Sequence, residues 1–174
     1  MPPRAVLVGL PGTGKTTTGR RLARMLGVPF ADSDELIEAA DGRTVAAIFA
    51  ESGEPAFRAA ERAAIAAALR EFDGVLSLGG GALTVDETRA VVLDAGAPVV
   101  LLEATISTLA ERVGDTSTRP LLDGGDPAAR LQTLSDQRRA VYEAVTTMRV
   151  DTTGRTPGQV AAHIAAKLHE KARA

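Results

Sequence analysis

The chain has 174 residues, of which 45% are hydrophobic, and a formal net charge of −2 at pH 7. This length fits a single domain that buries about 70% of its unfolded surface on folding. The slight negative charge and the 3% aromatic content argue against nucleic-acid binding, which needs basic patches or stacking platforms. The absence of cysteine excludes disulfides and thiolate metal sites. No apolar run approaches the ~20 residues that span a bilayer, so we expect a cytoplasmic protein that does not bind membranes.

The first apolar run, residues 5–8, is followed at residues 9–16 by Gly-Leu-Pro-Gly-Thr-Gly-Lys-Thr. This G-x-x-x-x-G-K-[ST] pattern between a strand and a helix predicts a P-loop, in which backbone N–H groups bind phosphate oxygens. We expect Lys15 to reach the β- and γ-phosphates and the Thr16 hydroxyl to ligate Mg²⁺. The predicted nucleotide site contains Gly12, Thr13, Gly14, Lys15, Thr16 and Thr17. A glycine-rich turn without a ligand is the competing interpretation, and the strand–loop–helix context disfavours it.

The rest of the chain alternates between extended and helical patterns. Strands are predicted at residues 5–8, 28–31, 75–78, 98–102 and 148–151. Helices are expected between them, the longest running from Phe57 to Leu69, and Thr84 with Glu87 predicts a capping box for the helix after the third strand. Apolar strands that alternate with helices predict an α/β fold with a parallel sheet covered on both faces. With no internal repeat or linker, residues 1–174 are expected to form one domain.

Polar residues and glycines follow the predicted strands, where ligands bind in parallel sheets. Asp32 is expected to orient Mg²⁺ through its waters, and Asp34 to bind or deprotonate an acceptor hydroxyl. Helix capping by Asp32 or Ser33 is the alternative, and both roles can hold together. The triple glycine at residues 79–81 allows a backbone to approach a ligand or to turn sharply. A polar, glycine-rich stretch from Gly114 to Asp126 predicts a mobile lid.

Local sequence leaves the role of Arg58 open. Glu54 and Glu61 lie at i−4 and i+3 from Arg58, the spacing of an ordinary surface ion pair. A wider comparison of motifs favours a site instead. Six motifs occur in the order and at the spacing seen in shikimate kinases: residues 9–16, 32–34, 53–61, 79–82 and 118–122, and Arg138-x-x-x-Tyr142. The chain therefore resembles the shikimate kinase family over nearly its whole length.

The resemblance implies a three-layer P-loop kinase fold with a five-stranded parallel sheet of order 2-3-1-4-5 flanked by helices. It also implies a substrate-binding helical region at residues 33–62, a lid at 113–126 and a monomer. The implied reaction transfers the γ-phosphate of ATP to the 3-hydroxyl of shikimate with Mg²⁺. A gluconate-type kinase remains an alternative enzyme. A nucleotide-dependent switch is the alternative of another class, and the sequence lacks its Asn-Lys-x-Asp guanine-binding motif.

The resemblance also assigns roles to individual residues. The implied shikimate site consists of Asp34, Arg58, Glu61, Gly79, Gly80, Gly81 and Arg138. The two arginines would hold the substrate carboxylate, which a planar guanidinium matches, and Glu61 would orient Arg58. The implied catalytic residues are Lys15, Asp34 and Arg119, the last of them in the lid. Implied contacts on the adenine side come from Arg112, Arg155 and Pro157. Arg138 is preferred over its neighbour Arg139 because it lies four residues before Tyr142; Ala140 stands where the family often has proline.

Overall fold

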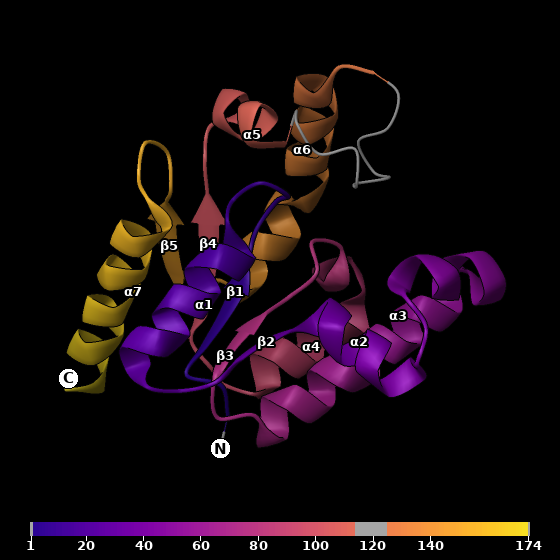
Figure 1. Ribbon diagram of the computed structural model, residues 1–174, viewed down its shortest axis with the longest axis horizontal. Coiled ribbons are helices and arrows are strands. Elements are labelled where there is room, and N and C mark those ends of the chain that lie inside the picture. Colours follow the sequence, from indigo (N-terminus) through magenta and orange to yellow (C-terminus); the bar gives the residue numbers. More distant parts are fainter. Residues whose placement is uncertain (1, 114–124, 174) are drawn as a thin grey trace.

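The computed structural model describes residues 2–113 and 125–173, which form one sheet with helices on both sides (Figure 1). The strands are β1 (Ala5–Val8), β2 (Phe30–Asp32), β3 (Val75–Ser77), β4 (Val99–Glu103) and β5 (Met148–Asp151). The helices are α1 (Lys15–Leu26), α2 (Ser33–Asp41), α3 (Val45–Glu71), α4 (Asp86–Asp94), α5 (Ile106–Val113), α6 (Pro127–Val145) and α7 (Pro157–Ala172), with a short 3-10 helix, η1 (Ala82–Thr84).

The sheet is parallel throughout, and its order β2-β3-β1-β4-β5 confirms the order that was expected. β1 lies at the centre, with Ala5 opposite Val75 of β3 and Val6 opposite Val99 of β4. All four residues of β1 are buried, as continuous apolar strands covered on both faces should be. Because the strands are parallel, the segments that follow β1, β2 and β3 all begin at the same edge of the sheet.

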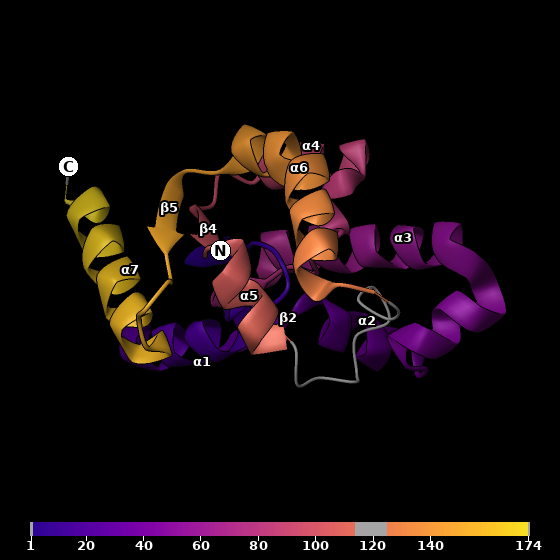
Figure 2. The same ribbon diagram turned by 90° about the horizontal axis from the view of Figure 1, so that it is seen from above.

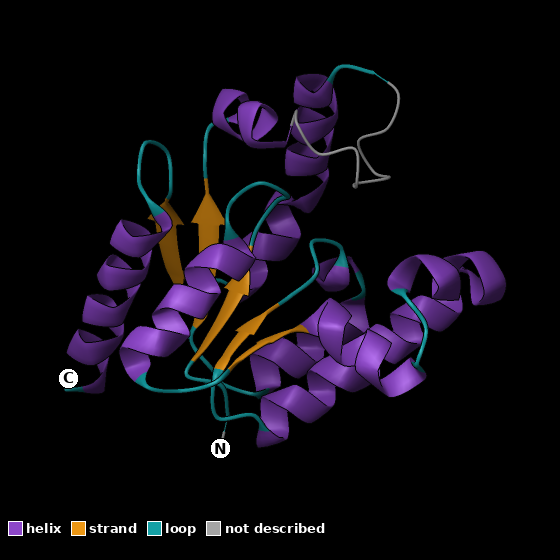
Figure 3. Ribbon diagram, viewed as in Figure 1, coloured by secondary structure: helices purple, strands orange, loops and turns teal. Residues whose placement is uncertain are grey.

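Two layers of helices enclose the sheet, each over an apolar core of its own (Figure 3). α1 and α7 pack on one face, where Leu22 and Ile164 meet the strands. α3, α4 and α6 pack on the other face, through Ile65, Val92 and Val145 respectively. The fold is therefore the predicted three-layer α/β arrangement. Among the described helices, none combines the length and apolar character needed to cross a membrane.

α3 is interrupted at Gly53, whose φ of 82° and ψ of 169° lie outside the helical region. Pro55 follows within the first turn after the break, where its missing N–H leaves no helical hydrogen bond unmade. Residues of α3 on both sides of the break pack with α2 around a small core of Ile37, Ile48 and Phe57. α2 and α3 lie at the opposite end of the molecule from α7 (Figure 2). Residues 33–62 are thus almost wholly helical.

Side chains cap α7 and α6, whereas the capping box that was predicted for α4 is absent. Thr156 and Gln159 form a complete capping box at the start of α7, and Asp126 accepts a hydrogen bond from the Ala128 N–H at the start of α6. The capping box of Thr84 and Glu87 is wrong. α4 begins after Val85, and the Thr84 hydroxyl instead donates to the carbonyl of Gly81 at 2.6 Å. Because α4 begins one residue later than expected, Val85 occupies the N-cap position and Thr84 belongs to the preceding 3-10 helix.

Candidate active site

The P-loop closes around the N-terminus of α1. Gly14 precedes the helix with φ 85°, a left-handed conformation that favours glycine. Lys15 is the first residue of α1, and its Nζ donates to the carbonyl oxygens of Gly9 at 2.8 Å and Leu10 at 3.2 Å. The Thr13 side chain is buried, and its hydroxyl donates to the Leu10 carbonyl at 2.8 Å. The loop therefore places helical N–H groups and a lysine at the carboxyl end of β1, an arrangement suited to phosphate.

Asp32 caps α2 and also lies beside Thr16, so its position is compatible with both roles that the sequence allowed. Its Oδ1 accepts a hydrogen bond from the Asp34 N–H at 3.0 Å, which caps α2. Its Oδ2 lies 3.5 Å from the hydroxyl of Thr16, on the first turn of α1. A hydroxyl and a carboxylate are hard oxygen ligands of the kind Mg²⁺ takes, usually together with water and substrate phosphates. Across residues 2–113 and 125–173 no group of three or more acidic or histidine side chains could hold a metal by itself, so the pair suits a metal that arrives with nucleotide.

Asp34 lies on the first turn of α2, close to charged groups of both signs. Burial raises the pKa of its carboxyl, and the negative charges of Asp32 and Glu38 raise it further. The positive charges of Lys15 and Arg58 act in the opposite direction. A half-buried carboxylate with a raised pKa, next to the P-loop lysine, can accept a proton from a hydroxyl more readily than an ordinary aspartate.

The Arg58–Glu61 pair is not the exposed ion pair that local spacing allowed. The Glu61 side chain is 1% exposed and accepts from Arg58 Nη1 at 2.7 Å, whereas Glu54 is exposed and lies 3.5 Å away. Burial raises the pKa of Glu61, and the hydrogen bond from Arg58 opposes that shift. Glu61 thus fixes one side of the Arg58 guanidinium and leaves the other nitrogen, Nη2, beside the glycine loop.

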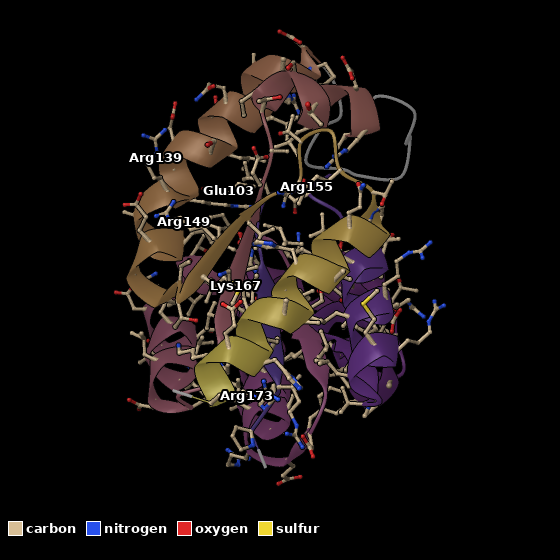
Figure 4. All side chains as sticks on the ribbon, turned by 90° about the vertical axis from the view of Figure 1, so that its left-hand side faces the viewer. Glu103, Arg139, Arg149, Arg155, Lys167 and Arg173 are labelled. Atoms are coloured by element: carbon tan, nitrogen blue, oxygen red, sulfur yellow. The ribbon has the colours of Figure 1, made fainter. Side chains whose placement is uncertain are left out.

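The structure separates Arg138 from Arg139 clearly. Arg138 is 6% exposed, although it is charged, and its Nη1 has no hydrogen-bond partner among the described residues. Arg139 is 65% exposed at its side chain and lies 3.7 Å from Asp136. Figure 4 shows Arg139 on the outer side of α6. A buried guanidinium with an unpaired nitrogen is a favourable place for a carboxylate, and Arg138 has these properties.

The triple glycine after β3, called here the glycine loop (residues 79–81), brings these side chains together. A Cβ atom on Gly79 would lie 3.0 Å from Asp34 Oδ1 and 3.1 Å from Glu61 Oε1. A Cβ on Gly80 would lie 2.9 Å from Arg138 Nη1, and one on Gly81 would lie 2.7 Å from Arg58 Nη2. The loop glycines are not among the glycines with positive φ. Glycine suits these positions because a Cβ atom at any of them would displace one of the charged side chains.

On the other side of the P-loop, Arg112 joins three segments. Its Nη1 donates to the Gly12 carbonyl at 3.2 Å and to the Thr152 hydroxyl at 3.0 Å, and its Nη2 donates to the Thr152 carbonyl at 2.9 Å. Arg155 lies on the loop between β5 and α7 (Figure 4), and Pro157 begins α7. The predicted residues of the adenine side thus come from segments that adjoin the P-loop.

Comparisons with known proteins agree with this geometry. A family model described as shikimate kinase matches residues 11–169. The shikimate kinase of Mycobacterium tuberculosis is 50% identical over 168 residues, which cover 97% of this chain and 94% of that protein. A solved structure of shikimate kinase from Acinetobacter baumannii in complex with shikimate has a TM-score of 0.90 at 32% identity, covering 98% of this chain and 94% of the other. The chain belongs to the shikimate kinase family.

Membership in the shikimate kinase family makes the chain an ATP-dependent kinase, so it is an enzyme and not a nucleotide-dependent switch. A solved gluconokinase from Sinorhizobium meliloti has a TM-score of 0.68 at 22% identity, with 99% of this chain and 94% of the other covered. At that identity the likeness shows a common fold and carries no information on the acceptor. One predicted catalytic residue, Arg119, and most of the predicted lid, residues 114–124, lie outside the described part of the chain.

Two aromatic residues lie near the candidate site, although helical spacing in the sequence predicted only that they pack in a core. Phe57 is buried, and the Arg58 guanidinium carbon lies 5.3 Å from its ring centroid. Phe49 is 36% exposed, and its ring centroid lies 4.5 Å from that of Phe57. Phe57 thus links the Arg58 guanidinium to the partly exposed ring of Phe49, which offers an apolar surface next to the charged side chains. The available signal was the position of Phe57 directly before Arg58, which helical periodicity alone treats as packing.

A separate cavity of about 280 Å³ lies behind the P-loop, between β4, α5 and α6. Leu10, Leu109 and Tyr142 contribute to its lining, and Glu103 and Arg149, labelled in Figure 4, lie at the same face. Thr13 is the only predicted site residue among those that line this cavity. Its lining includes none of the glycine-loop residues.

Proposed function

We propose that the chain transfers the γ-phosphate of ATP to the 3-hydroxyl of shikimate, giving shikimate 3-phosphate and ADP. The observation that carries this proposal is the convergence of Asp34, Arg58 and Arg138 on the glycine loop. Two guanidiniums and a carboxylate at one loop match an acceptor that bears both a carboxylate and hydroxyls. The A. baumannii relative, which was solved in complex with shikimate, supports the same acceptor.

In the donor half, the P-loop N–H groups and Lys15 would hold the β- and γ-phosphates of ATP. To do so, the Lys15 ammonium exchanges its bonds to the Gly9 and Leu10 carbonyls for bonds to phosphate oxygens. Thr16 and Asp32 would hold Mg²⁺. When bound, this ion would neutralise negative charge that develops on the phosphoryl group during transfer. Arg112, Arg155 and Pro157 would contact the adenine side, and Arg119 would approach the phosphates from a lid.

In the acceptor half, Arg58 and Arg138 would bind the substrate carboxylate, and Asp34 would orient the attacking hydroxyl. Glu61 keeps Arg58 in position through the 2.7 Å bond. The raised pKa of the Asp34 carboxyl lets it take the hydroxyl proton as the oxygen attacks the γ-phosphorus. Positioning and charge complementarity supply most of the rate enhancement in phosphoryl transfer, and apart from proton acceptance by Asp34 every residue named here would act in one of these two ways.

The test is a coupled ADP-release assay with Mg-ATP and each of shikimate, quinate and gluconate. We expect shikimate to be the preferred acceptor, and phosphorus–proton NMR of the product to place the phosphate on the 3-hydroxyl. Phosphorylation of gluconate with no turnover of shikimate would overturn the proposal. We also propose that the chain acts as a cytoplasmic monomer. Sedimentation of the purified protein at assay concentration would test the monomeric state.

A further inference from the structure

The glycine loop needs to be restrained if it is to serve as a wall of the acceptor site. Glycine has more backbone freedom than any other residue, so three in a row favour a mobile segment. Yet the backbone here lies directly against Arg58 Nη2 and Arg138 Nη1, with no space for a Cβ atom. A shift of the loop would change how both guanidiniums meet a substrate, and displacements near 1 Å are large on the scale of catalytic positioning.

Two hydrogen bonds from distant parts of the chain restrain the loop. The Gly79 N–H donates to the hydroxyl of Ser33 at 2.9 Å, across 46 residues of sequence. The Tyr142 hydroxyl donates to the carbonyl of Gly80 at 3.0 Å, across 62 residues. Ser33 is completely buried at the start of α2, and Tyr142 is 6% exposed within α6. The side-chain ends of both bonds are thus removed from water, which would otherwise compete for the two hydroxyls.

Each of these residues lies next to a residue of the acceptor site. Ser33 directly precedes Asp34, and Tyr142 lies one helical turn after Arg138 on the same face of α6. The two bonds therefore connect the glycine loop to the two helices that carry these groups. On this basis, which rests on the proposed function, we infer that Ser33 and Tyr142 are positioning residues that set the distance between the glycine loop and the shikimate-binding side chains.

The Tyr142 hydroxyl can donate a hydrogen bond at neutral pH. Burial raises the pKa of its phenol, and the nearby charge of Arg138 offsets only part of this shift. The phenol therefore stays protonated at neutral pH and continues to donate to the Gly80 carbonyl. Its ring belongs to the core between α6 and the sheet, so Tyr142→Phe removes the hydroxyl and keeps the apolar contacts.

The experiment compares Tyr142→Phe and Ser33→Ala with the wild-type chain. We expect the KM for shikimate to rise about fivefold in each variant, the effect of one lost hydrogen bond. The KM for ATP should stay within about twofold, because the P-loop takes no part in either bond. Amide hydrogen exchange should become faster in the glycine loop and stay unchanged in the P-loop. If Tyr142→Phe does not fold, Ser33→Ala carries the same test.

The matched control is Thr147→Val. The Thr147 hydroxyl also bonds backbone groups that are distant in sequence: it donates to the Val99 carbonyl at 3.1 Å and accepts from the Val99 N–H at 3.0 Å. We expect Thr147→Val to alter the melting temperature without changing the KM for shikimate. An equal rise in both KM values for Tyr142→Phe and Ser33→Ala would overturn the inference, as would unchanged exchange in the glycine loop. The exchange comparison needs no turnover, so it still decides the inference if the wild-type chain fails to phosphorylate shikimate.

Discussion

Replacing Arg138 with methionine should separate substrate binding from stability. Arg138 is 6% exposed, and its Nη1 has no hydrogen-bond partner among the described residues. A buried charge with an unsatisfied donor lowers the stability of a fold, whereas an apolar side chain of similar length fills the same space without that cost. The Arg138→Met protein should therefore bind shikimate more weakly and, without ligand, be at least as stable as the wild type.

The size of both effects follows from the environment of the guanidinium. A hydrogen bond to a charged group contributes about 1.5–3 kcal/mol, so shikimate should bind about 10- to 150-fold more weakly. Removal of the unsatisfied donor should add about 1 kcal/mol to the free energy of unfolding of the ligand-free protein, which for a chain of this size raises the melting temperature by about 2–4 °C.

Isothermal calorimetry with shikimate and thermal melting without ligand measure the two effects. Arg139→Met is the matched control, because Arg139 is the adjacent residue and its side chain is 65% exposed. This control should bind shikimate and melt like the wild type. The reasoning would be refuted if Arg138→Met bound shikimate with wild-type affinity, or if it melted several degrees lower.

Three further changes test other parts of the site. Lys15→Ala should lower kcat by about 10³-fold or more, since a preorganised charge on the transferring phosphoryl group is lost; a near-normal rate would remove Lys15 from catalysis. Asp34→Asn should melt higher than wild type at pH 7, because burial raises the pKa of Asp34 and its ionisation therefore opposes folding. That advantage should disappear as the pH falls below the ordinary aspartate pKa of about 3.9, and equal melting temperatures at pH 7 would contradict it. Gly80→Ala places a methyl group 2.9 Å from Arg138 Nη1. Given typical costs of overpacking, the KM for shikimate should rise about tenfold while the KM for ATP stays unchanged. Wild-type affinity for shikimate would show that the guanidinium need not stay in place.

Much of the fold could be predicted because its signals are local. The apolar runs located all five strands, although β2 covers Phe30–Asp32 where residues 28–31 were expected. The capping box at Thr84 failed because α4 begins one residue later, with Val85 at the N-cap position, and helix boundaries inferred from sequence shift easily by one or two residues. Strand order is not a local property, and it came from the family resemblance.

The sequence by itself determined that the chain binds a nucleotide, since the P-loop pattern and its strand–loop–helix context are contiguous. Only the tertiary structure decided which of the other charged residues are buried. Arg138 and Arg139 are adjacent, and Arg58 has carboxylates at ordinary ion-pair spacing, so their local sequences do not distinguish a buried site from a solvated surface. Burial depends on the segments that pack over a side chain, and here the packing segment is the glycine loop, which Ser33 and Tyr142 hold from 46 and 62 residues away. The physical reason is that burial and close approach are properties of the assembled fold.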